Sequence, residues 1–286
     1  AVAQPLAPSG VHSSAASLVN RGEAMRTPAP YAGATFDSGL KIGKVPAKPG
    51  MLMNTVRLDP KVGLSAAGQQ FRFSYSTTNQ HGAVAPSTGA MFFPKGKPPA
   101  GGWPVLAWAH GTVGLADQCT PSMNPRSARD TDYLNHWLNQ GYAIVASDYA
   151  GMSTDGLMSY LNGKSTAANV VDSVIAAQDL PAVRQGGQTL SRNWAVIGQS
   201  QGGGAALHVA LRATSRSKEA NLNFIGTVAT GAPAYVEEIV LAGSPTFPPV
   251  PLPAGLNTYA MYILAAFREA NPNIDVDSAL TPEGKR

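Results

Sequence analysis

The stretch WAVIGQSQGGGAAL, residues 194–207, decides the fold of this 286-residue chain. It begins as an apolar run typical of a buried strand and ends in small residues typical of a closely packed helix. Between these halves, Gly198, Ser200 and Gly202 form a G-x-S-x-G pattern. A serine on a sharp strand-to-helix turn exposes its hydroxyl, and the flanking glycines leave room where strand and helix cross. The stretch therefore predicts a nucleophile elbow at Ser200.

Strand-like and helix-like segments alternate around this turn. We expect strands at residues 105–109, 142–147, 194–198 and 224–229, and helices at about 128–140, 165–180 and 201–213. Apolar residues alternate with polar ones at 71–75, and a second strand-like run follows at 89–93, so a β-hairpin is expected ahead of the main sheet. Strands that alternate with helices indicate βαβ units. The predicted fold class is α/β, with a mostly parallel, doubly wound sheet.

The two ends of the chain differ from this central part. Residues 1–50 are rich in Pro, Ala, Gly and Ser and predict an N-terminal arm with one short helix at about 14–26. Residues 51–233 form the predicted core. Residues 234–286 combine helix-like runs at 234–242 and 256–270 with a proline-rich stretch, and carry no further strand pattern. We interpret them as the beginning of an inserted helical cap, so the chain resembles the N-terminal part of a domain that lacks its last strands.

Composition excludes several classes of protein. Charged residues make up 13% of the chain, and the net charge of +4 is spread out. The lysines and arginines between Lys41 and Lys61 are not interleaved with aromatic residues, which favours a solvated face over a nucleic-acid site. The longest apolar run, residues 259–267, is far shorter than the roughly 20 residues of a membrane span, so no stable membrane anchor is expected.

The ends and the cysteine content bear on the compartment. The chain starts without methionine or an apolar leader, which fits a mature exported protein, secreted or periplasmic. Cys119 is the one cysteine. A pairing partner elsewhere, a free thiol and a plain buried thiol all remain open for it.

The histidines do not complete a triad in the usual order. In an elbow architecture the acid and then the histidine follow the serine. His208 lies eight residues up the helix that Ser200 begins, at a distance of roughly 12 Å, and is interpreted as a packing residue. The other histidines all precede the serine: His12, His81, His110 and His136. Asp275 and Asp277 follow it, but they lie in the cap-like tail. We therefore expect the triad acid and histidine to lie outside this chain.

An oxyanion hole is predicted beside Ser200. His110, Gly111 and Thr112 directly follow the strand at 105–109, where a backbone N–H can face a developing oxyanion. Gln201, the residue after the serine, supplies a second N–H by its position. Each such donor is worth roughly 3–4 kcal/mol in acyl transfer. The first donor is the N–H of either Gly111 or Thr112, and the alternative is that this segment is only a tight turn.

A second loop follows the strand at 142–147. Tyr149 is expected to line the substrate pocket together with His110, whereas Asp148 is interpreted as a loop or cap residue, because it precedes the serine. The glycines at 156 and 163 are too far apart for a phosphate-binding loop, and Ser200 stands where a dinucleotide-binding fingerprint needs glycine. No Cys/His grouping has metal-ligand spacing, so neither cofactor nor metal is expected.

Several stretches together carry a resemblance to a known family. They are Lys48-Pro49-Gly50, Trp103-Pro104-Val105, residues 109–114 leading to 119–122, residues 147–151 and residues 198–203. In this spaced combination they resemble the secretory lipase family of α/β-hydrolases, especially its bacterial esterase members. The resemblance runs from about residue 45 to about residue 235.

The resemblance implies a carboxylic-ester hydrolase, esterase or lipase, acting on lipidic, small acyl or aromatic esters without a cofactor. It implies Ser200 as nucleophile, Gln201 and the Gly111–Thr112 loop as oxyanion donors, and a cap between the sixth and seventh strands. In the family the acid and histidine come after the cap. We therefore expect a complementary C-terminal chain of the same precursor, cleaved after Lys285-Arg286 or nearby, to supply them, the last strands and a cysteine partner for Cys119; an unpaired strand edge would otherwise be an aggregation hazard.

Other functions are compatible with the same residues. A hydrolase-like binding module without catalysis would explain the missing histidine directly. A rearranged triad could use His110 or His136, and would make this chain active alone. An acyltransferase would use the same serine and oxyanion donors with an acceptor other than water.

Overall fold

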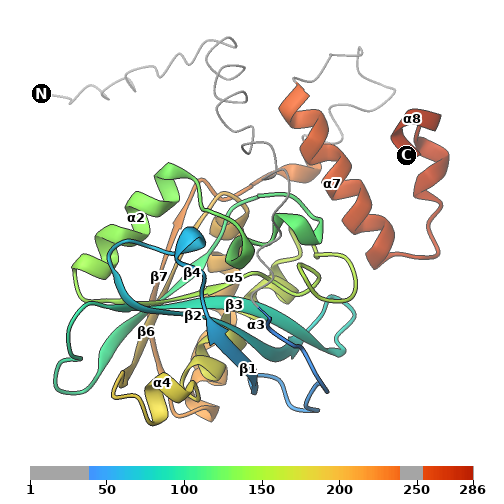
Figure 1. Ribbon diagram of the computed structural model, residues 1–286. Helices are drawn as coiled ribbons and strands as arrows, with labels where there is room; N and C mark the ends of the chain where they lie inside the picture. The colour runs from blue at the N-terminus through green and yellow to red at the C-terminus, as the bar shows by residue number, and fades with distance from the viewer. Residues whose placement is uncertain (1–38, 239–253, 286) are drawn as a thin grey trace, which may run out of the picture.

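A seven-stranded sheet forms the centre of the computed structural model, which describes residues 39–238 and 254–285 (Figure 1). The spatial order is β1-β2-β3-β5-β4-β6-β7. The pairs β1–β2, β2–β3 and β3–β5 are antiparallel, whereas β5, β4, β6 and β7 run parallel. The strands are β1 Leu52–Arg57, β2 Ala67–Thr78, β3 Val84–Pro94, β4 Trp103–Ala109, β5 Ala143–Ser147, β6 Leu190–Gln199 and β7 Asn223–Thr230.

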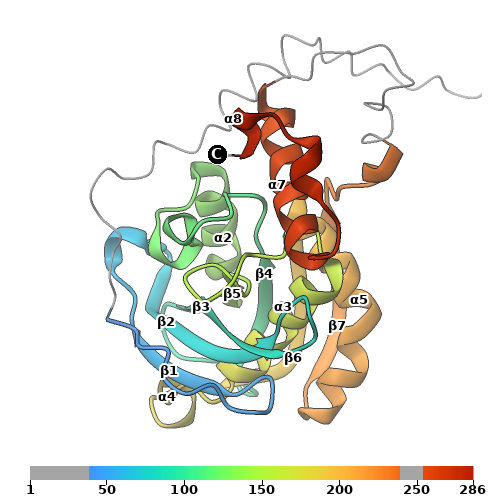
Figure 2. The ribbon, with the colours of Figure 1, turned by 90° about the vertical axis from the view of Figure 1, so that its right-hand side faces the viewer.

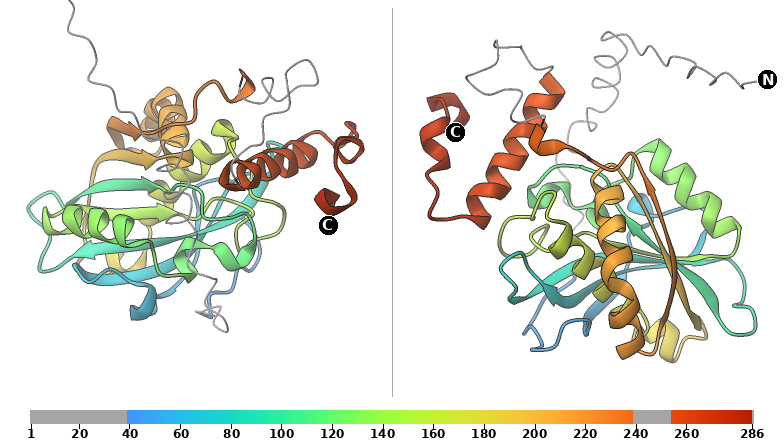
Figure 3. Two further views of the ribbon diagram at one scale, coloured as in Figure 1. Left: turned by 90° about the horizontal axis from the view of Figure 1, so that it is seen from above. Right: turned by 180° about the vertical axis from the view of Figure 1, so that it is seen from behind.

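Helices cover both faces of this sheet. The α-helices are α2 Ala128–Asn139, α3 Gly163–Ala177, α4 Pro181–Arg184, α5 Gln201–Glu219, α7 Ala254–Ala270 and α8 Pro282–Lys285. Short 3₁₀ turns are η1 Pro60–Val62, η2 Asp117–Cys119, η3 Pro121–Met123 and η4 Val276–Ala279. Helices α3 and α5 lie on one face and α2 on the other, while α7 and α8 stand beyond the body, at the end where α3 and α5 begin (Figures 2 and 3).

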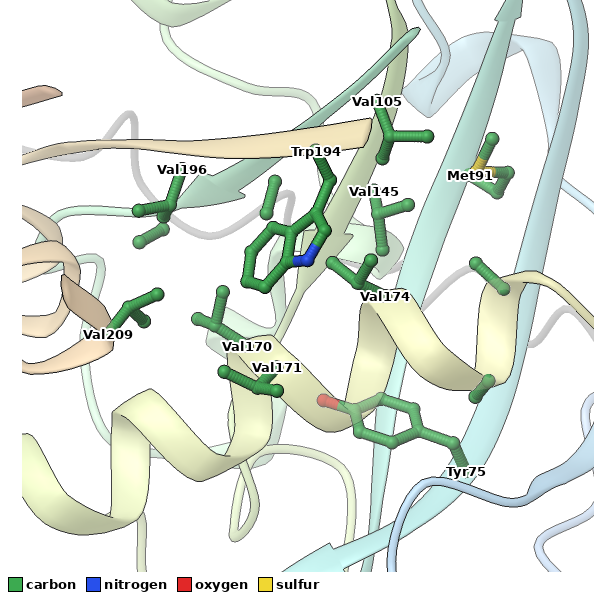
Figure 4. Close-up of a cluster of buried hydrophobic side chains, with 14 of the residues drawn as sticks. Tyr75, Met91, Val105, Val145, Val170, Val171, Val174, Trp194, Val196 and Val209 are labelled. Carbon is green, nitrogen blue, oxygen red and sulfur yellow. The ribbon is translucent and has the colours of Figure 1, made fainter. Parts of the chain in front are cut away.

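The core on the α3 side is built from valines around one tryptophan. Val170 and Val174 of α3 lie against Trp194 of β6, beside side chains from the neighbouring strands (Figure 4). Burying each aliphatic side chain contributes about 1.5–3 kcal/mol. The indole N–H of Trp194 donates to Ser217 Oγ of α5 at 3.0 Å, so the polar atom of this buried ring is satisfied. The packing fixes α3 and α5 against the strand that leads to Ser200.

The opposite face is covered by α2. Leu134 and Leu138 of this helix are buried in a second cluster with Phe92 and Ile144. The helix begins where Ser127 Oγ accepts a hydrogen bond from the N–H of Asp130, a standard N-cap. This start agrees with the expected helix at about 128–140.

The sequence prediction of a mostly parallel sheet preceded by a hairpin is confirmed. Strand β1 was not expected, because its sequence LMNTVR shows no clear alternation; it forms by pairing with the edge of β2. Helix α5 continues to Glu219, well past the expected end at 213. The expected helix at 256–270 is present as α7. The arm helix at 14–26 and part of the run at 234–242 lie outside the described residues.

Exposed apolar side chains lie on both faces of the sheet near its β7 edge. Leu207 and Leu211 of α5 are 51% and 80% exposed, and Ile225 and Val228 of β7 are 63% and 49% exposed. Within the described ranges, β7 is the terminal strand and pairs only with β6. We call these four side chains and the outer edge of β7 the β7 face. Exposed apolar patches of this kind mark an interaction surface.

An ion pair between a buried aspartate and a half-buried arginine connects the two helices of the α3 face. Arg216 of α5 lies 3.1 Å from Asp172 of α3 and also donates to the carbonyl oxygen of Pro49 at 2.9 Å. Thr77 Oγ1 donates to the other Asp172 oxygen at 2.9 Å. Burial raises the pKa of Asp172, although Thr77 and Arg216 pull it the other way. The pair therefore joins α3, α5, β2 and the loop before β1.

Replacing the arginine, Arg216→Met, is expected to lower the free energy of unfolding of the complete protein by about 3 kcal/mol at neutral pH, because Asp172 is left buried and unpaired. The change raises the folded-state pKa of Asp172 further above its unfolded value. Proton uptake then favours the folded state, so the deficit is largest above that raised pKa and shrinks as the pH falls through it.

Urea denaturation of the wild type and of Arg216→Met at a series of pH values measures this loss of unfolding free energy. The control is Arg184→Met, which breaks the exposed pair with Asp179 and is expected to cost less than about 1 kcal/mol at any pH. An Arg216→Met deficit that is independent of pH would contradict the interpretation.

Candidate active site

Ser200 occupies a strained turn between β6 and α5. Its backbone angles are φ 57° and ψ −125°, a conformation that residues with a side chain rarely adopt. Such a conformation costs of order 1–3 kcal/mol and persists only where the surroundings determine it. The N–H of Ser200 donates to the carbonyl oxygen of Thr230, at the end of β7, at 2.9 Å. The strand before the turn and the helix after it match the sequence prediction of an elbow.

The flanking glycines are required by close backbone contact. A Cβ at Gly198 would collide with the carbonyl oxygen of Gly202, and a Cβ at Gly202 would collide with the carbonyl oxygen of Ala109. Both obstacles are backbone atoms, which cannot turn aside. The start of α5 thus lies directly against the end of β4 and brings Ser200 beside the loop that follows β4.

That loop is the expected oxyanion segment. A Cβ placed on Gly111 would lie 3.5 Å from Ser200 Cβ, so the loop and the nucleophile turn are in contact. Gln201 is the first residue of α5 and is buried, and its backbone N–H belongs to the first turn, where no helical acceptor exists. Both parts of the expected oxyanion hole therefore flank Ser200.

His110 and Tyr149 lie behind this loop. They are 4% and 0% exposed, and their rings stack with centroids 4.2 Å apart. The Tyr149 hydroxyl donates to the carbonyl oxygen of His110 at 3.1 Å, and His110 Nδ1 donates to the carbonyl oxygen of Gly111 at 2.7 Å. Both residues are predicted from the sequence to line the substrate pocket, and that role stays a prediction. Their contacts in the structure are with the backbone of the oxyanion loop, which they hold from inside.

Burial makes His110 a poor proton carrier. It lowers the pKa of the imidazole, and the hydrogen bond to Gly111 and the charge of Asp148 only partly offset this effect. Both ring nitrogens face backbone carbonyl oxygens, Nδ1 that of Gly111 at 2.7 Å and Nε2 that of Asp148 at 3.2 Å. Because a trans peptide is planar, fixing the carbonyl oxygens of His110 and Gly111 also fixes the N–H directions of Gly111 and Thr112.

Asp148 is engaged by structural hydrogen bonds. Its carboxylate accepts from the N–H of Ser122 at 2.8 Å, from Ser122 Oγ at 2.5 Å and from Thr88 Oγ1 at 2.7 Å. The side chain is fully buried. These bonds agree with its interpretation as a loop residue and leave it unsuited to orient a catalytic histidine.

The histidines in the described ranges contact groups other than Ser200. His110 is held as above, His81 lies 3.8 Å from Glu269, and His136 packs edge-on against Trp137. His208 lies over Gly163 at the start of α3. Its side chain is nevertheless exposed, so the contact with Gly163 covers only part of the ring that the sequence predicts to be a packing residue. His12 is outside the described residues.

The two tail aspartates also have local roles. Asp275 Oδ1 accepts from the N–H of Ser278 at 3.1 Å as the cap of η4. Asp277 forms an ion pair with Arg268 at 2.8 Å. Cys119 is a half-buried free thiol whose pKa is raised by burial. In the described ranges no group of side chains could hold a metal ion, and no helix there is both long and apolar enough to cross a bilayer.

A groove of about 240 Å³ runs from Gln201 along α5. Its walls come from α5, from the segment before α3 and from α7, and it is mainly apolar. The lining includes Leu161, Thr166 of α3, Gln201, Ala205 and His208 of α5, and Ile263 of α7. Sequence patterns could not locate this groove, because its walls are distant in sequence.

The sheet order, the strained serine turn and the loop after β4 define an α/β-hydrolase fold. The chain is similar to Candida antarctica lipase A in its closed state, with 19% identity, a TM-score of 0.63, and coverage of 90% of this chain and 58% of that one. It is also similar to LipA, a rice cell wall degrading esterase from Xanthomonas oryzae, with 22% identity, a TM-score of 0.60, and coverage of 80% and 62%. The chain thus spans about three fifths of these proteins.

Residues 126–249 match the model of the family described as Secretory lipase. This match confirms, for that part of the chain, the resemblance inferred from the sequence. A search of curated protein sequences finds no match. The domain boundaries at 50/51 and 233/234 and the assigned site roles remain predictions.

Substitution of the second elbow glycine, Gly202→Ala, is expected to prevent correct closure of the turn, because the new Cβ meets the Ala109 carbonyl oxygen. We expect a loss of at least 3 kcal/mol in unfolding free energy, measured by urea denaturation, in line with overpacked cores. The control is Gly204→Ala, whose Cβ would lie 3.6 Å from Pro233 Cδ. It is expected to be neutral or to stabilise α5 by up to about 1 kcal/mol. Equal stability of the two variants would refute the close crossing.

Proposed function

We propose that this chain carries the nucleophile and the oxyanion hole of a secreted carboxylic-ester hydrolase. The observation that carries the proposal is Ser200 in its strained turn, in contact with the Gly111 loop. Two backbone N–H groups can then converge on the oxygen of a carbonyl carbon that Ser200 attacks, one from Gln201 and one from Gly111 or Thr112. Such preorganised donors stabilise the tetrahedral intermediate of acyl transfer.

The reaction proceeds in two halves. Ser200 Oγ attacks the ester carbonyl carbon while a histidine accepts its proton, and collapse of the tetrahedral intermediate expels the alcohol, which takes that proton. Water then attacks the acyl-enzyme with the same histidine as base, and the carboxylic acid leaves with Ser200 restored. An acceptor alcohol in place of water would give acyl transfer through the same residues.

The histidine and the triad acid come from a complementary C-terminal segment of the same precursor. The β7 face supports this, because Leu207 and Leu211 on one side of the sheet and Val228 on the other are exposed beside a strand edge that is unpaired within the described ranges. An added strand on β7 and a helix over α5 would cover both. Ser200 N–H is bonded to Thr230 at the end of β7, so a segment that continues the sheet there arrives beside the nucleophile.

The groove along α5 receives the acyl group. It starts at Gln201, next to the nucleophile, and its lining is mainly apolar. Ile263 contributes from α7, which we interpret as part of the cap. The family description Secretory lipase supports an exported protein acting on lipidic esters, and small acyl or aromatic esters are further candidate substrates.

Labelling of the complete protein with a fluorophosphonate, followed by intact mass spectrometry, tests the nucleophile. One adduct at Ser200 is expected. Ser200→Ala should take up none and should hydrolyse p-nitrophenyl esters at least about 10⁴-fold more slowly. If the complete protein, with its complementary segment present, is neither labelled nor active, the proposal fails and a binding module without catalysis becomes the better account.

Narrowing the groove tests where the acyl group lies. Ile263→Trp is expected to raise KM for a p-nitrophenyl octanoate by about tenfold, the effect of a lost apolar contact of roughly 1.4 kcal/mol, and to leave the acetate ester unchanged. Leu256→Trp, an exposed position on the same helix that does not line the groove, is the matched control and should change neither. Equal effects on both esters would place the acyl group elsewhere.

A further inference from the structure

Arg72 is a buried cation in the middle of the sheet. It belongs to β2, is 5% exposed, and is preceded and followed by phenylalanine. Because side chains alternate along a strand, Arg72 points to the α2 face, while Phe73 and Tyr75 belong to the core on the α3 face. Burying a charge is expensive unless it is fully hydrogen-bonded. The position therefore requires partners, and the structure provides them.

Three hydroxyl groups surround the guanidinium. Nε donates to Ser122 Oγ at 2.7 Å, and Nη2 donates to Ser153 Oγ at 2.8 Å and, more weakly, to Thr88 Oγ1 at 3.4 Å. Each hydroxyl has its own proton left to donate. Ser122 and Thr88 donate theirs to Asp148, and Ser153 lies 3.1 Å from Thr88 Oγ1. The arginine and the aspartate are thus joined through hydroxyl groups.

The network links two loops that flank the nucleophile. Ser122 lies in the first, residues 110–127, which begins with the oxyanion segment. Ser153 lies in the second, residues 148–162, and its N–H also donates to Asp117 Oδ1 of the first loop at 2.8 Å. Arg72 is therefore a rigid strand residue that holds one hydroxyl of each loop.

The second loop needs such support. Tyr149, Ser153 and Leu161 all have positive φ, at 68°, 54° and 57°. Each of these residues carries a side chain, so each conformation costs on the order of 1–2 kcal/mol. Contacts elsewhere must hold the loop in this shape, and the bond from Arg72 to Ser153 acts at one of the strained positions.

The second loop in turn shapes the oxyanion segment. The Asp148 carbonyl oxygen lies 3.2 Å from His110 Nε2, and the Tyr149 hydroxyl donates to the His110 carbonyl oxygen. Near the other end of the loop, the Tyr160 hydroxyl lies 2.9 Å from Thr112 Oγ1. A shift of this loop therefore moves the peptides of Gly111 and Thr112.

We propose that Arg72 is a positioning residue for the oxyanion hole, holding the loops 110–127 and 148–162 in register beside Ser200. The inference rests on the proposed function, because its effect is on acyl transfer. The forked guanidinium is needed, since a lysine ammonium is a compact charge on a flexible stem and cannot hold the two serine hydroxyls in one fixed plane. Misplacement of donors by about 1 Å can cost on the order of 100-fold in rate.

The test measures kcat, KM and the rate of fluorophosphonate labelling in the complete protein for Arg72→Met, Arg72→Lys and Ser153→Ala. Arg72→Met is expected to lower kcat and the labelling rate by roughly 10- to 100-fold with KM changed by less than about threefold. Arg72→Lys should recover part of that loss. Ser153→Ala, which removes one arm of the network, should give a smaller loss in the same direction.

Arg216→Met is the control, since it removes a half-buried arginine on the opposite face that is bonded to Asp172 and Pro49 and to neither loop. It should lower stability and leave kcat within about twofold at a temperature where all variants are folded. A labelled wild type together with folded Arg72→Met at the wild-type kcat overturns the inference and leaves the proposed function standing.

An unlabelled wild type overturns the proposed function first, and the inference with it. If Arg72→Met does not fold, Ser153→Ala decides: an unchanged kcat and labelling rate in that variant overturn the positioning role.

Discussion

The rest of the structure depends on one close crossing of backbone. Helix α5 begins so near to β4 that a single added carbon at Gly202 would overlap the carbonyl oxygen of Ala109, and Gly198 meets Gly202 in the same way. This contact forces the chain through the strained angles of Ser200. It also brings the loop after β4 against the serine, so one packing constraint sets the positions of the proposed nucleophile and the proposed oxyanion segment.

Two clusters of polar side chains, one on each face of the sheet, connect the elements around this crossing. On the α3 face, the ion pair of Asp172 and Arg216 joins α3 and α5, the two helices that cover β6. On the α2 face, Arg72 and Asp148 join the loops that frame the serine. An apolar side chain could pack at either arginine position. It could not form the hydrogen bonds that fix a loop or a helix end in one position. The Arg72 cluster fixes loops at the carboxyl edge of the sheet, whereas the Arg216 pair fixes the helix layer near the far end of α5 from Ser200.

The elbow and the parallel strands could be predicted because their signals are local. The pattern around Ser200 joins a strand, a turn and a helix within 14 residues, and each βα unit has its own hydrophobic run. The network at Arg72 could not be predicted, because Ser122 and Ser153 lie 50 and 81 residues away in sequence. The stacking of His110 on Tyr149 could not be predicted for the same reason, because it depends on contacts between two loops. Their positions after strand ends suggest only that both lie at the carboxyl edge of the sheet. Strand β1 escaped notice because pairing, not its own composition, makes it a strand.

The bond from the Ser200 N–H to the Thr230 carbonyl oxygen gives the edge strand a mechanical role. Thr230 Oγ1 also donates to the Gly198 carbonyl oxygen at 3.3 Å. The end of β7 is therefore hydrogen-bonded to the turn on both sides of Gln199. A shift of β7 along β6 would move the Ser200 backbone directly, because these two hydrogen bonds connect them. The backbone position of Ser200 is thus tied directly to the outermost described strand.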